Sequence, residues 1–284
     1  MARSSYQAPR GTFDVLPAEK RVRRRVERVA ATILSRAGYE PIATPAFEDT
    51  DLFERGVGRS TDVVRKEMFT FEDKGGRSVT LRPEGTAPIC RAYLEHGMHK
   101  LAQPVKLYYR GPFFRHERPQ AGRYRQFHQI GLETIGTDSP LADAEAIMLL
   151  SDVLTELGVP GVKLRLGSLG SLESRRDYLE ELKAYLHSHE AELSKDVRER
   201  IEINPLRAFD SDDEGTRATM AGAPTIVERL DGEDAKHFAE VRSLLEAAGV
   251  PYEVDPTLVR GLDYYTRTIF SFVCEELGAQ SEVG

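Results

Sequence analysis

The sequence lacks any membrane-spanning run and contains almost no cysteine. No stretch approaches the roughly 18 uninterrupted apolar residues of a transmembrane helix, and the leader MARSSYQAPRGTFD lacks the apolar core of a secretory signal. We therefore expect a soluble, cytoplasmic protein. The two cysteines, Cys90 and Cys274, have no partner at metal-ligand spacing, so neither a disulfide framework nor a zinc site is supported. We expect both to be small buried hydrophobes.

Two common nucleotide-binding loops are also absent. The sequence contains neither GxxxxGK[ST] nor GxGxxG after a strand. Any ATP site must therefore be built differently. No internal repeat or low-complexity tract occurs either.

Excess positive charge is lacking, but a local cationic segment is present. The 284 residues carry 39 Lys and Arg against 46 Asp and Glu, a net charge of −7, which argues against a protein that coats nucleic acid by charge alone. One sixteen-residue segment nevertheless holds a single acid, Glu117, among five arginines: Arg110, Arg115, Arg118, Arg123 and Arg125. This segment indicates a defined anionic ligand. The arginines between positions 21 and 28 are explained more simply as the solvated face of a helix.

The order of predicted elements favours an α+β fold. Helical periodicity predicts helices over residues 17–37, 140–157 and 233–248, and a further helix after residue 83. Strand-like runs over 105–115 and 125–136 predict a long-looped antiparallel hairpin, and residues 162–168 and the segment after Pro251 also alternate like strands. We expect an antiparallel sheet flanked by helices, with a catalytic core over residues 1–170, a small helical insertion over 171–222 and the remainder of the core over 223–284.

Strand parity identifies a candidate pocket. Alternate side chains of a strand share a face, which groups five residues of the second hairpin strand: Arg125, Phe127, Gln129, Gly131 and Glu133. A buried unpaired carboxylate costs several kcal/mol, so this face suits the floor of a polar pocket. A solvent-facing antiparallel sheet explains the pattern equally well.

Four segments of the sequence carry a resemblance to a known enzyme family. Residues 114–129 read FRHERPQAGRYRQFHQ, and this segment resembles motif 2 of the class II aminoacyl-tRNA synthetases in the form that the histidyl-tRNA synthetases use. GYEPIATPAFED resembles the motif 1 region, which in the family builds the dimer interface; TLRPEGT resembles the amino-acid-binding loop; and LVRGLDYYTRTIF resembles the family's signature segment. These blocks occur in family order across residues 9 to 284.

The resemblance implies an ATP-dependent ligase that joins histidine to tRNA(His) through histidyl-adenylate. Arg115 and Arg260 match the family arginines on either side of the ATP α-phosphate, where guanidinium groups stabilise developing negative charge. Glu117 and Phe127 also match the ATP site, with Phe127 stacked on adenine, although ordinary sheet packing is its alternative. Mg²⁺ would arrive with the phosphates rather than at a dedicated protein metal site.

The same resemblance implies a histidine pocket and contacts to tRNA. Glu84 and Gln129 match residues that receive the ammonium group, with Thr86 close by, whereas Glu133 and Tyr265 match those that hold the imidazole. Tyr264 either lines this pocket or belongs to the core. His116 and Arg123 in the motif 2 loop would approach ATP or the tRNA acceptor end, unless the loop is simply solvated. The charged insertion occupies the position of a helical domain that closes over the acceptor stem.

Two further readings remain open. The family continues past a segment such as GAQSEVG into motif 3 and an anticodon-binding domain, so we expect at best weak adenylate formation from this chain alone, and an inactive dimeric fragment is the extreme case. A non-catalytic regulatory subunit of ATP phosphoribosyltransferase, from histidine biosynthesis, shares the architecture. Arg115, Arg260, Glu133 and the RGLDYYT segment argue against it, because a histidine sensor would not need them together.

Overall fold

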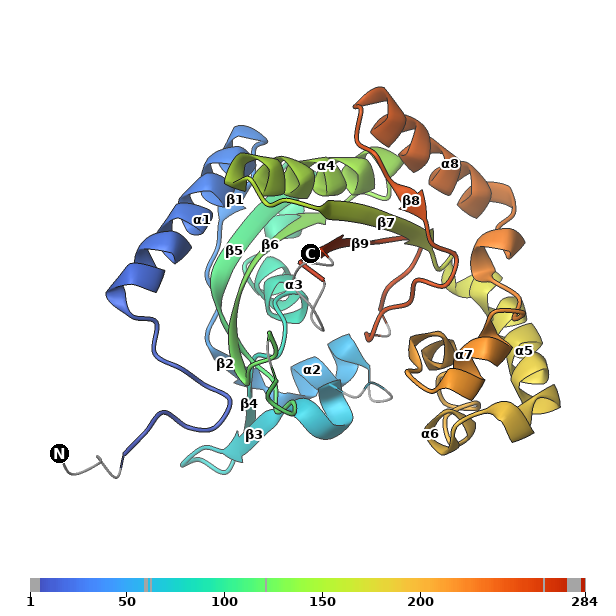
Figure 1. Cartoon of the computed structure of the whole chain (residues 1–284). Helices are drawn as coiled ribbons and strands as arrows, with labels where there is room; N and C mark the ends of the chain where they lie inside the picture. Colours follow the sequence, from blue (N-terminus) through green and yellow to red (C-terminus); the bar gives the residue numbers. More distant parts are fainter. Residues whose placement is uncertain are drawn as a thin grey trace. The chain divides into compact units, whose positions relative to one another are not determined.

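The computed structural model describes residues 6–58, 61, 63–120, 122–262, 264–274 and 282–283. Helices and three three-stranded sheets make up an α+β fold in this part of the chain (Figure 1). The chain divides into two compact units, one of residues 1–138, 149–161 and 275–281, the other of residues 139–148, 162–274 and 282–284. Each unit is described by itself, and the domain boundaries at residues 170 and 222 stay a prediction. Among the described residues, no helix is both long and apolar enough to cross a membrane.

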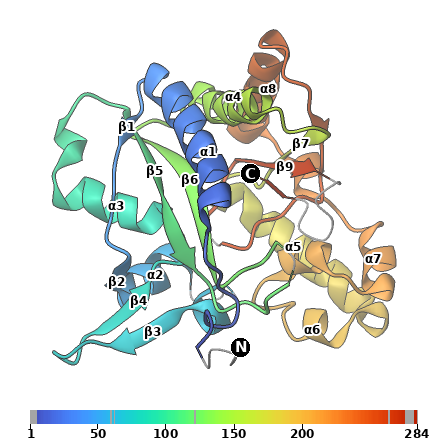
Figure 2. The same ribbon diagram turned by 60° about the vertical axis from the view of Figure 1, so that its left-hand side comes forward.

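The first unit begins with the long helix α1 (Pro17–Arg36), as its periodicity predicts. Proline is favourable in the first turn because its missing N–H needs no partner there. The helix buries Ala30 and Leu34, and Leu34 joins Tyr39, Tyr108 and Leu149 in an apolar cluster. α1 thereby lies beside the strand that carries Tyr108 (Figure 2).

The predicted hairpin is confirmed, and it supplies two of the three strands of the first sheet. β5 (Val105–Phe114) and β6 (Gln126–Ile135) pair antiparallel along their whole length, from Val105 opposite Ile135 to Phe114 opposite Gln126. A short strand, β1 (Glu40–Pro41), adds to β5 in parallel. The register places Gly131 opposite Tyr109 and Gln129 opposite Gly111, so the face grouped by parity in the sequence exists as one face of β6.

A second sheet and two helices complete this unit. β2 (Phe47–Asp49), β4 (Ser78–Leu81) and β3 (Phe69–Glu72) form an antiparallel sheet, in which β4 is central. Helix α2 (Thr50–Val57) follows β2, a π-helical turn η1 (Val63–Glu67) precedes β3, and α3 (Thr86–Glu95) follows β4 before the 3₁₀ turn η2 (Met98–Lys100). The apolar side of α3 buries Ile89 against Val105 and Leu107 of β5.

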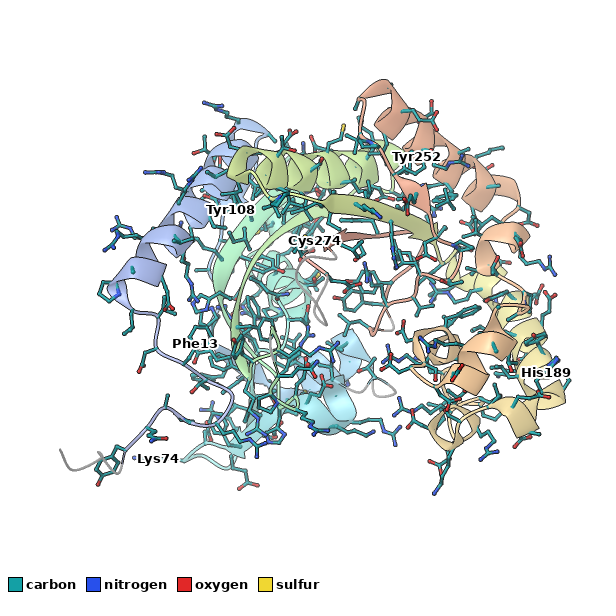
Figure 3. The ribbon with its side chains drawn as sticks, in the orientation of Figure 1. Phe13, Lys74, Tyr108, His189, Tyr252 and Cys274 are labelled. Atoms are coloured by element: carbon teal, nitrogen blue, oxygen red, sulfur yellow. The ribbon has the colours of Figure 1, made fainter. Side chains whose placement is uncertain are left out.

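The two cysteines differ in their surroundings. Cys274 is the last residue of strand β9 (Thr268–Cys274) and is buried, as expected (Figure 3). The expectation of a buried Cys90 is wrong, because its side chain is exposed. Successive helical residues turn by about 100°, so burying Ile89 against the sheet rotates Cys90 out of the core.

The second unit combines the third sheet with most of the remaining helices. β7 (Val162–Ser168) pairs antiparallel with β9 (Thr268–Cys274) and parallel with β8 (Glu253–Val254). Helix α8 (Gly232–Ala247) precedes β8, and α4 (Pro140–Leu157) contributes residues 140–148 here and 149–157 to the first unit. The expectation that the whole segment after Pro251 alternates as strands is wrong, because residues 255–262 and 264–267 form turns and loops.

The segment 171–222 is helical, as predicted, and its apolar side chains lie in a buried cluster that also includes Leu169, Ala223, Ile226 and Ile269. It contains α5 (Leu172–Ser188), α6 (Lys195–Arg198) and α7 (Glu214–Met220), joined by 3₁₀ turns η3 (Glu190–Glu192) and η4 (Pro205–Asp210), with η5 (Ile226–Arg229) following. Tyr178, Leu182 and Leu186 of α5 pack into a buried cluster with Val197, Ile201 and Met220. The many charged side chains of this segment therefore surround a buried apolar cluster.

Two glycines, Gly85 and Gly131, make room for the side chain of Tyr109. A Cβ atom added to Gly131 would lie 2.3 Å from the Tyr109 ring, and one added to Gly85 would lie at the same distance from it. Both distances are well inside van der Waals contact. The tyrosine ring therefore lies directly against both backbones, which links β5, β6 and the start of α3.

Gly131→Ala should destabilise the chain by about 1–3 kcal/mol, because overpacking forces the tyrosine or the strand to move. Urea unfolding followed by circular dichroism measures the change. Gly261→Ala is the control, since its new Cβ would have its nearest contact at 3.8 Å, and it should change stability by less than about 0.5 kcal/mol. Equal stability of the Gly131 variant and the parent would contradict the packing.

Candidate active site

The floor of the candidate site begins with Glu84 at the amino end of α3. Its side chain is 4% exposed. One carboxylate oxygen accepts a hydrogen bond from the Thr86 amide at 2.6 Å, and the other accepts one from the Ala87 amide at 3.0 Å. A helix amino terminus offers such unpaired amides. Burial raises the pKa of Glu84, although the two amides and the nearby Arg115 oppose that rise.

Glu133 of β6 meets the same helix end. The Thr86 hydroxyl donates a hydrogen bond to its carboxylate at 2.8 Å. Burial raises the pKa of Glu133 to about 7; the Thr86 hydrogen bond opposes this shift, and the charge of Glu84 adds to it. Two carboxylates thus share one polar recess, and an ordinary solvent-facing strand would not produce such a shift.

Cys90 belongs to the surroundings of these carboxylates. Although Cys90 reaches solvent, neighbouring protein atoms partly desolvate its thiol and raise its pKa, and the charges of Glu133 and Glu84 raise the pKa further. Cys90 lies one helical turn after Thr86, so the two side chains share a face of α3.

Arg115 stands where β5 ends. Its Nε donates to the Pro83 carbonyl at 2.9 Å, and its guanidinium carbon lies 5.3 Å from the centre of the Phe127 ring. Pro83 immediately precedes Glu84, so the arginine is fixed to the loop that carries the carboxylate. Its Nη1 also lies 3.9 Å from Glu117. A guanidinium, an aromatic face and two carboxylates are therefore assembled within one unit.

The loop between β5 and β6 holds the remaining motif 2 residues. Glu117 lies 3.8 Å from Arg123, and its carbonyl accepts from Arg125 Nε at 3.3 Å. His116 is exposed; its amide donates to the Glu67 carbonyl at 2.7 Å, and its ring meets Phe69 edge-on at 5.3 Å. These contacts tie the loop to η1 and β3. Gln129 is half-buried on β6.

Sequence reasoning missed Arg82 and Tyr109 as supports of this site. Arg82 is buried; its guanidinium lies 4.6 Å from the centre of the Phe113 ring and donates to the carbonyls of Pro112 at 3.0 Å and Thr44 at 2.9 Å. Its place inside TLRPEGT was the available signal. Tyr109 had no local signal, because its importance comes from contact with two glycines.

In the second unit, Arg260 is held beside β9. Its Nη1 lies 3.0 Å from Glu282, and Nη2 donates to the Phe270 carbonyl. The Ser271 hydroxyl donates to the same Glu282 oxygen at 2.9 Å. Tyr264 and Tyr265 stack with ring centres 4.9 Å apart. Asp263 of the signature segment lies outside the described residues, and the convergence of Arg115 with Arg260 stays a prediction because they belong to different units.

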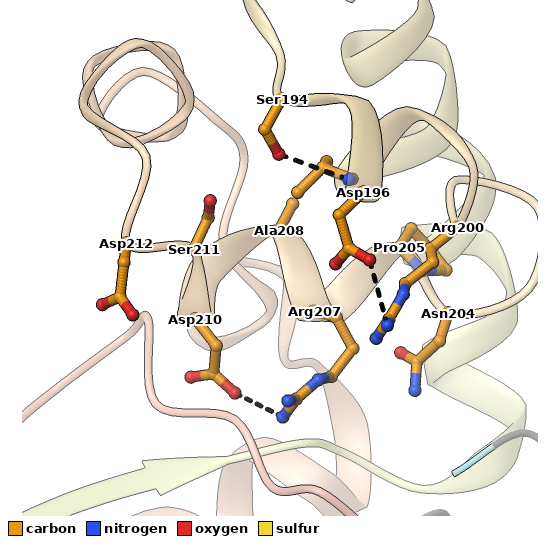
Figure 4. A pocket seen from close by; sticks show the side chains of 11 residues that line it. Ser194, Asp196, Arg200, Asn204, Pro205, Arg207, Ala208, Asp210, Ser211 and Asp212 are labelled. Carbon is orange, nitrogen blue, oxygen red and sulfur yellow. Dashed lines mark hydrogen bonds and ion pairs between the residues drawn. The ribbon is translucent and has the colours of Figure 1, made fainter. Parts of the chain in front are cut away.

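A second cavity lies in the helical segment of this unit (Figure 4). It has a volume of about 220 Å³ and is lined by residues of α6, η4 and their flanking loops. Arg200 is 3.1 Å from Asp196, and Arg207 is 2.6 Å from Asp210, whose pKa is raised by burial. Each arginine thus has a carboxylate partner. Across the described ranges, no cluster of three His, Cys, Asp or Glu side chains could hold a metal ion.

Comparison with known proteins assigns the chain to a family. The family model described as histidyl-tRNA synthetase matches residues 11–283. The chain belongs to the histidyl-tRNA synthetase family. A histidine–tRNA ligase from Rhodospirillum rubrum is 53% identical over 281 residues, which are 99% of this chain and 68% of that protein. The corresponding ligase from Thermosynechococcus vestitus is 50% identical over 277 residues, covering 98% and 65%.

A solved structure agrees with the assignment to this synthetase family. The apo crystal structure of histidyl-tRNA synthetase from S. aureus is 38% identical, with a TM-score of 0.75. The match covers 95% of this chain and 62% of that one. The chain therefore spans about two thirds of the length of these relatives.

Glu133→Gln should change how stability depends on pH. The folded chain keeps the Glu133 proton up to a pH of about 7, whereas the ordinary value is 4.5. The folded state therefore binds more protons in this window, and the parent's free energy of unfolding should fall, relative to the variant, as pH rises from 4.5 to about 7. Urea unfolding across this range measures the difference.

The exposed Glu156 of α4 supplies the matched control. Glu156→Gln should leave the pH profile of the parent unchanged. Parallel profiles for the parent and the Glu133 variant would show that Glu133 titrates normally.

Proposed function

We propose that this chain carries the histidine-activating centre of a cytoplasmic histidine–tRNA ligase. In this reaction a carboxylate oxygen of histidine attacks the α-phosphorus of ATP, the bond to the β-phosphate breaks, and pyrophosphate leaves. A ribose hydroxyl at the end of tRNA(His) then attacks the acyl carbon and releases AMP. The observation that carries the proposal is the recess of Glu84, Thr86 and Glu133, within a chain of this family.

The recess suits the two polar ends of histidine. Glu84 and Gln129 receive the ammonium group with Thr86, because a buried carboxylate can pair with a cation that it meets without water. Glu133 and Tyr265 hold the imidazole, with Tyr264 at the pocket wall. A buried site built to hydrogen-bond a substrate rejects analogues that leave its groups unpaired. The raised pKa of Glu133 supports this role, since an imidazole N–H would stabilise its carboxylate form.

ATP would bind beside this recess. Arg115 stabilises the charge that develops on the α-phosphate, with Arg260 as the second guanidinium, and Phe127 stacks on adenine. Glu117 orients the ATP end of the motif 2 loop, and Mg²⁺ enters with the nucleotide as part of the substrate. His116 and Arg123 meet the tRNA acceptor end, which agrees with the exposure of His116.

Arg115→Lys should reduce histidine-dependent ATP–pyrophosphate exchange by roughly 100-fold, because lysine cannot reproduce a planar, bidentate phosphate contact. Arg118→Lys changes an exposed arginine of the same loop and should retain the parent's rate. Equal exchange by both variants would remove Arg115 from the reaction. A parent that does not bind ATP, yet forms a stable complex with a phosphoribosyltransferase, would replace the ligase by the regulatory function.

We also propose that the chain pairs with a second copy of itself through the surface beside α1. A groove of about 510 Å³ lies between α1 and the outer face of the hairpin and includes Phe13, Val22 and Ile130, which are 46%, 65% and 36% exposed. Glu27 lies in it 3.9 Å from Arg110. A surface with apolar residues and charges of both signs can complement itself across a twofold axis.

Val22→Asp should convert a dimer into a monomer, because two carboxylates would be buried in the shared interface. Sedimentation equilibrium measures the mass. Leu172→Asp, at an exposed leucine of α5, should leave the dimer intact. A monomeric parent, or a Val22 variant that remains dimeric, would contradict this interface.

A further inference from the structure

Arg175 connects the helical segment 171–222 to Tyr265 of the signature segment. It lies in the first turn of α5 and is 8% exposed. Its Nε donates to the Leu169 carbonyl at 3.1 Å, and its Nη2 donates to the Tyr265 carbonyl at 2.5 Å. One planar guanidinium thus binds the backbone just before α5 and the backbone of the signature segment, in which Tyr265 lies 90 positions after Arg175.

A buried arginine is costly unless its donors find acceptors. Arg175 meets that requirement with two backbone carbonyls. Apolar packing alone would hold α5 without a charge, as Tyr178, Leu182 and Leu186 already do. The specific consequence of the guanidinium is a fixed distance between Leu169 and Tyr265.

The surrounding contacts strengthen the same junction. The Leu169 amide donates to the Arg267 carbonyl at 2.8 Å, and the Arg267 amide donates to the Gly170 carbonyl at 2.7 Å. Arg267 has a φ of 54°, which is rare for a residue with a side chain, so the surrounding contacts must hold it there. Asp234 accepts from the Ser171 amide at 2.8 Å and from the Ser174 hydroxyl, and it lies 3.5 Å from Arg267.

Tyr265 is also packed from the side of the helices. Its ring and Leu258 lie against the apolar cluster of the helical segment. Arg175 fixes the Tyr265 backbone and the cluster supports its ring, so the direction of the tyrosine hydroxyl depends on the helices.

We infer that Arg175 is a positioning residue for histidine recognition, which aims Tyr265 through the Tyr265 carbonyl. This inference rests on the proposed function, since it takes Tyr265 as an imidazole contact. It makes the orientation of Tyr265 depend on the helical segment, in addition to any contact of that segment with tRNA. A displacement of α5 would reach Tyr265 directly.

Arg175→Lys tests the inference. Lysine keeps the charge but replaces the planar fork by one ammonium group, so the Tyr265 carbonyl loses its fixed partner. Calorimetric titration of the chain should show a dissociation constant for histidine raised about tenfold, as expected from losing one charged hydrogen bond. The dissociation constant for ATP should stay within about twofold of the parent's value. General destabilisation would weaken the binding of both ligands and would not affect histidine alone. Arg176→Lys, at the exposed neighbour on α5, should bind both ligands as the parent does.

A double-mutant cycle with Tyr265→Phe separates positioning from structure. If Arg175 acts through Tyr265, Arg175→Lys should change histidine affinity by less than about twofold once the hydroxyl is gone. Full additivity of the two changes would overturn the inference. Equal weakening of histidine and ATP binding would overturn it as well.

The remaining outcomes are also decisive. If the lysine variant shows no cooperative thermal transition, Arg175→Gln repeats the test without a buried charge. If neither variant folds, Arg175 serves the general stability of the chain, and the inference is overturned. A parent that binds no histidine overturns the proposed function and this inference with it. A parent that binds histidine no better than its folded Arg175 variants overturns the inference alone.

Discussion

The site depends on a pair of carboxylates held in one buried recess. Glu84 is fixed by two amides at the start of α3, and Glu133 reaches the same helix through the Thr86 hydroxyl. Burying negative charge is unfavourable, and the raised pKa values of both groups express that cost. A recess of this kind is prepared for a cationic or N–H-bearing ligand, and histidine offers both.

The fold of the first unit holds this recess in place. β5 and β6 pair over their full length, Tyr109 lies against Gly85 and Gly131, and Arg115 is fixed to the Pro83 carbonyl. These contacts connect the hairpin to the amino end of α3 from two sides. In the second unit, the helical cluster, Arg175 and β9 determine the path of the signature segment. The residues proposed to bind substrate are thus supported by regular structure rather than by loops alone.

Much of this arrangement could be predicted from the sequence, because local patterns determine it. Helical periodicity predicted α1, α4 and α8, and strand parity placed Gln129, Gly131 and Glu133 on one face. Long-range contacts had no local signal. The exposure of Cys90 follows from the packing of α3 against the sheet. The segment after Pro251 alternates like a strand in sequence, but much of it forms loops. In sequence, Arg175 resembles any other charged residue of an amphipathic helix, and only the structure shows its contact with Tyr265. Family resemblance supplied the roles of residues, whereas hydrogen bonds and burial supplied the reasons for them.

The most direct test of the account is the titration of the Glu133 carboxyl by carbon NMR, with the resonance assigned through Glu133→Gln. The free chain should show a pKa of about 7, and saturating histidine should lower it, because a hydrogen bond from the imidazole stabilises the carboxylate. A Glu133 that titrates at the ordinary value, or whose pKa histidine leaves unchanged, would contradict the assignment of this recess to the amino acid.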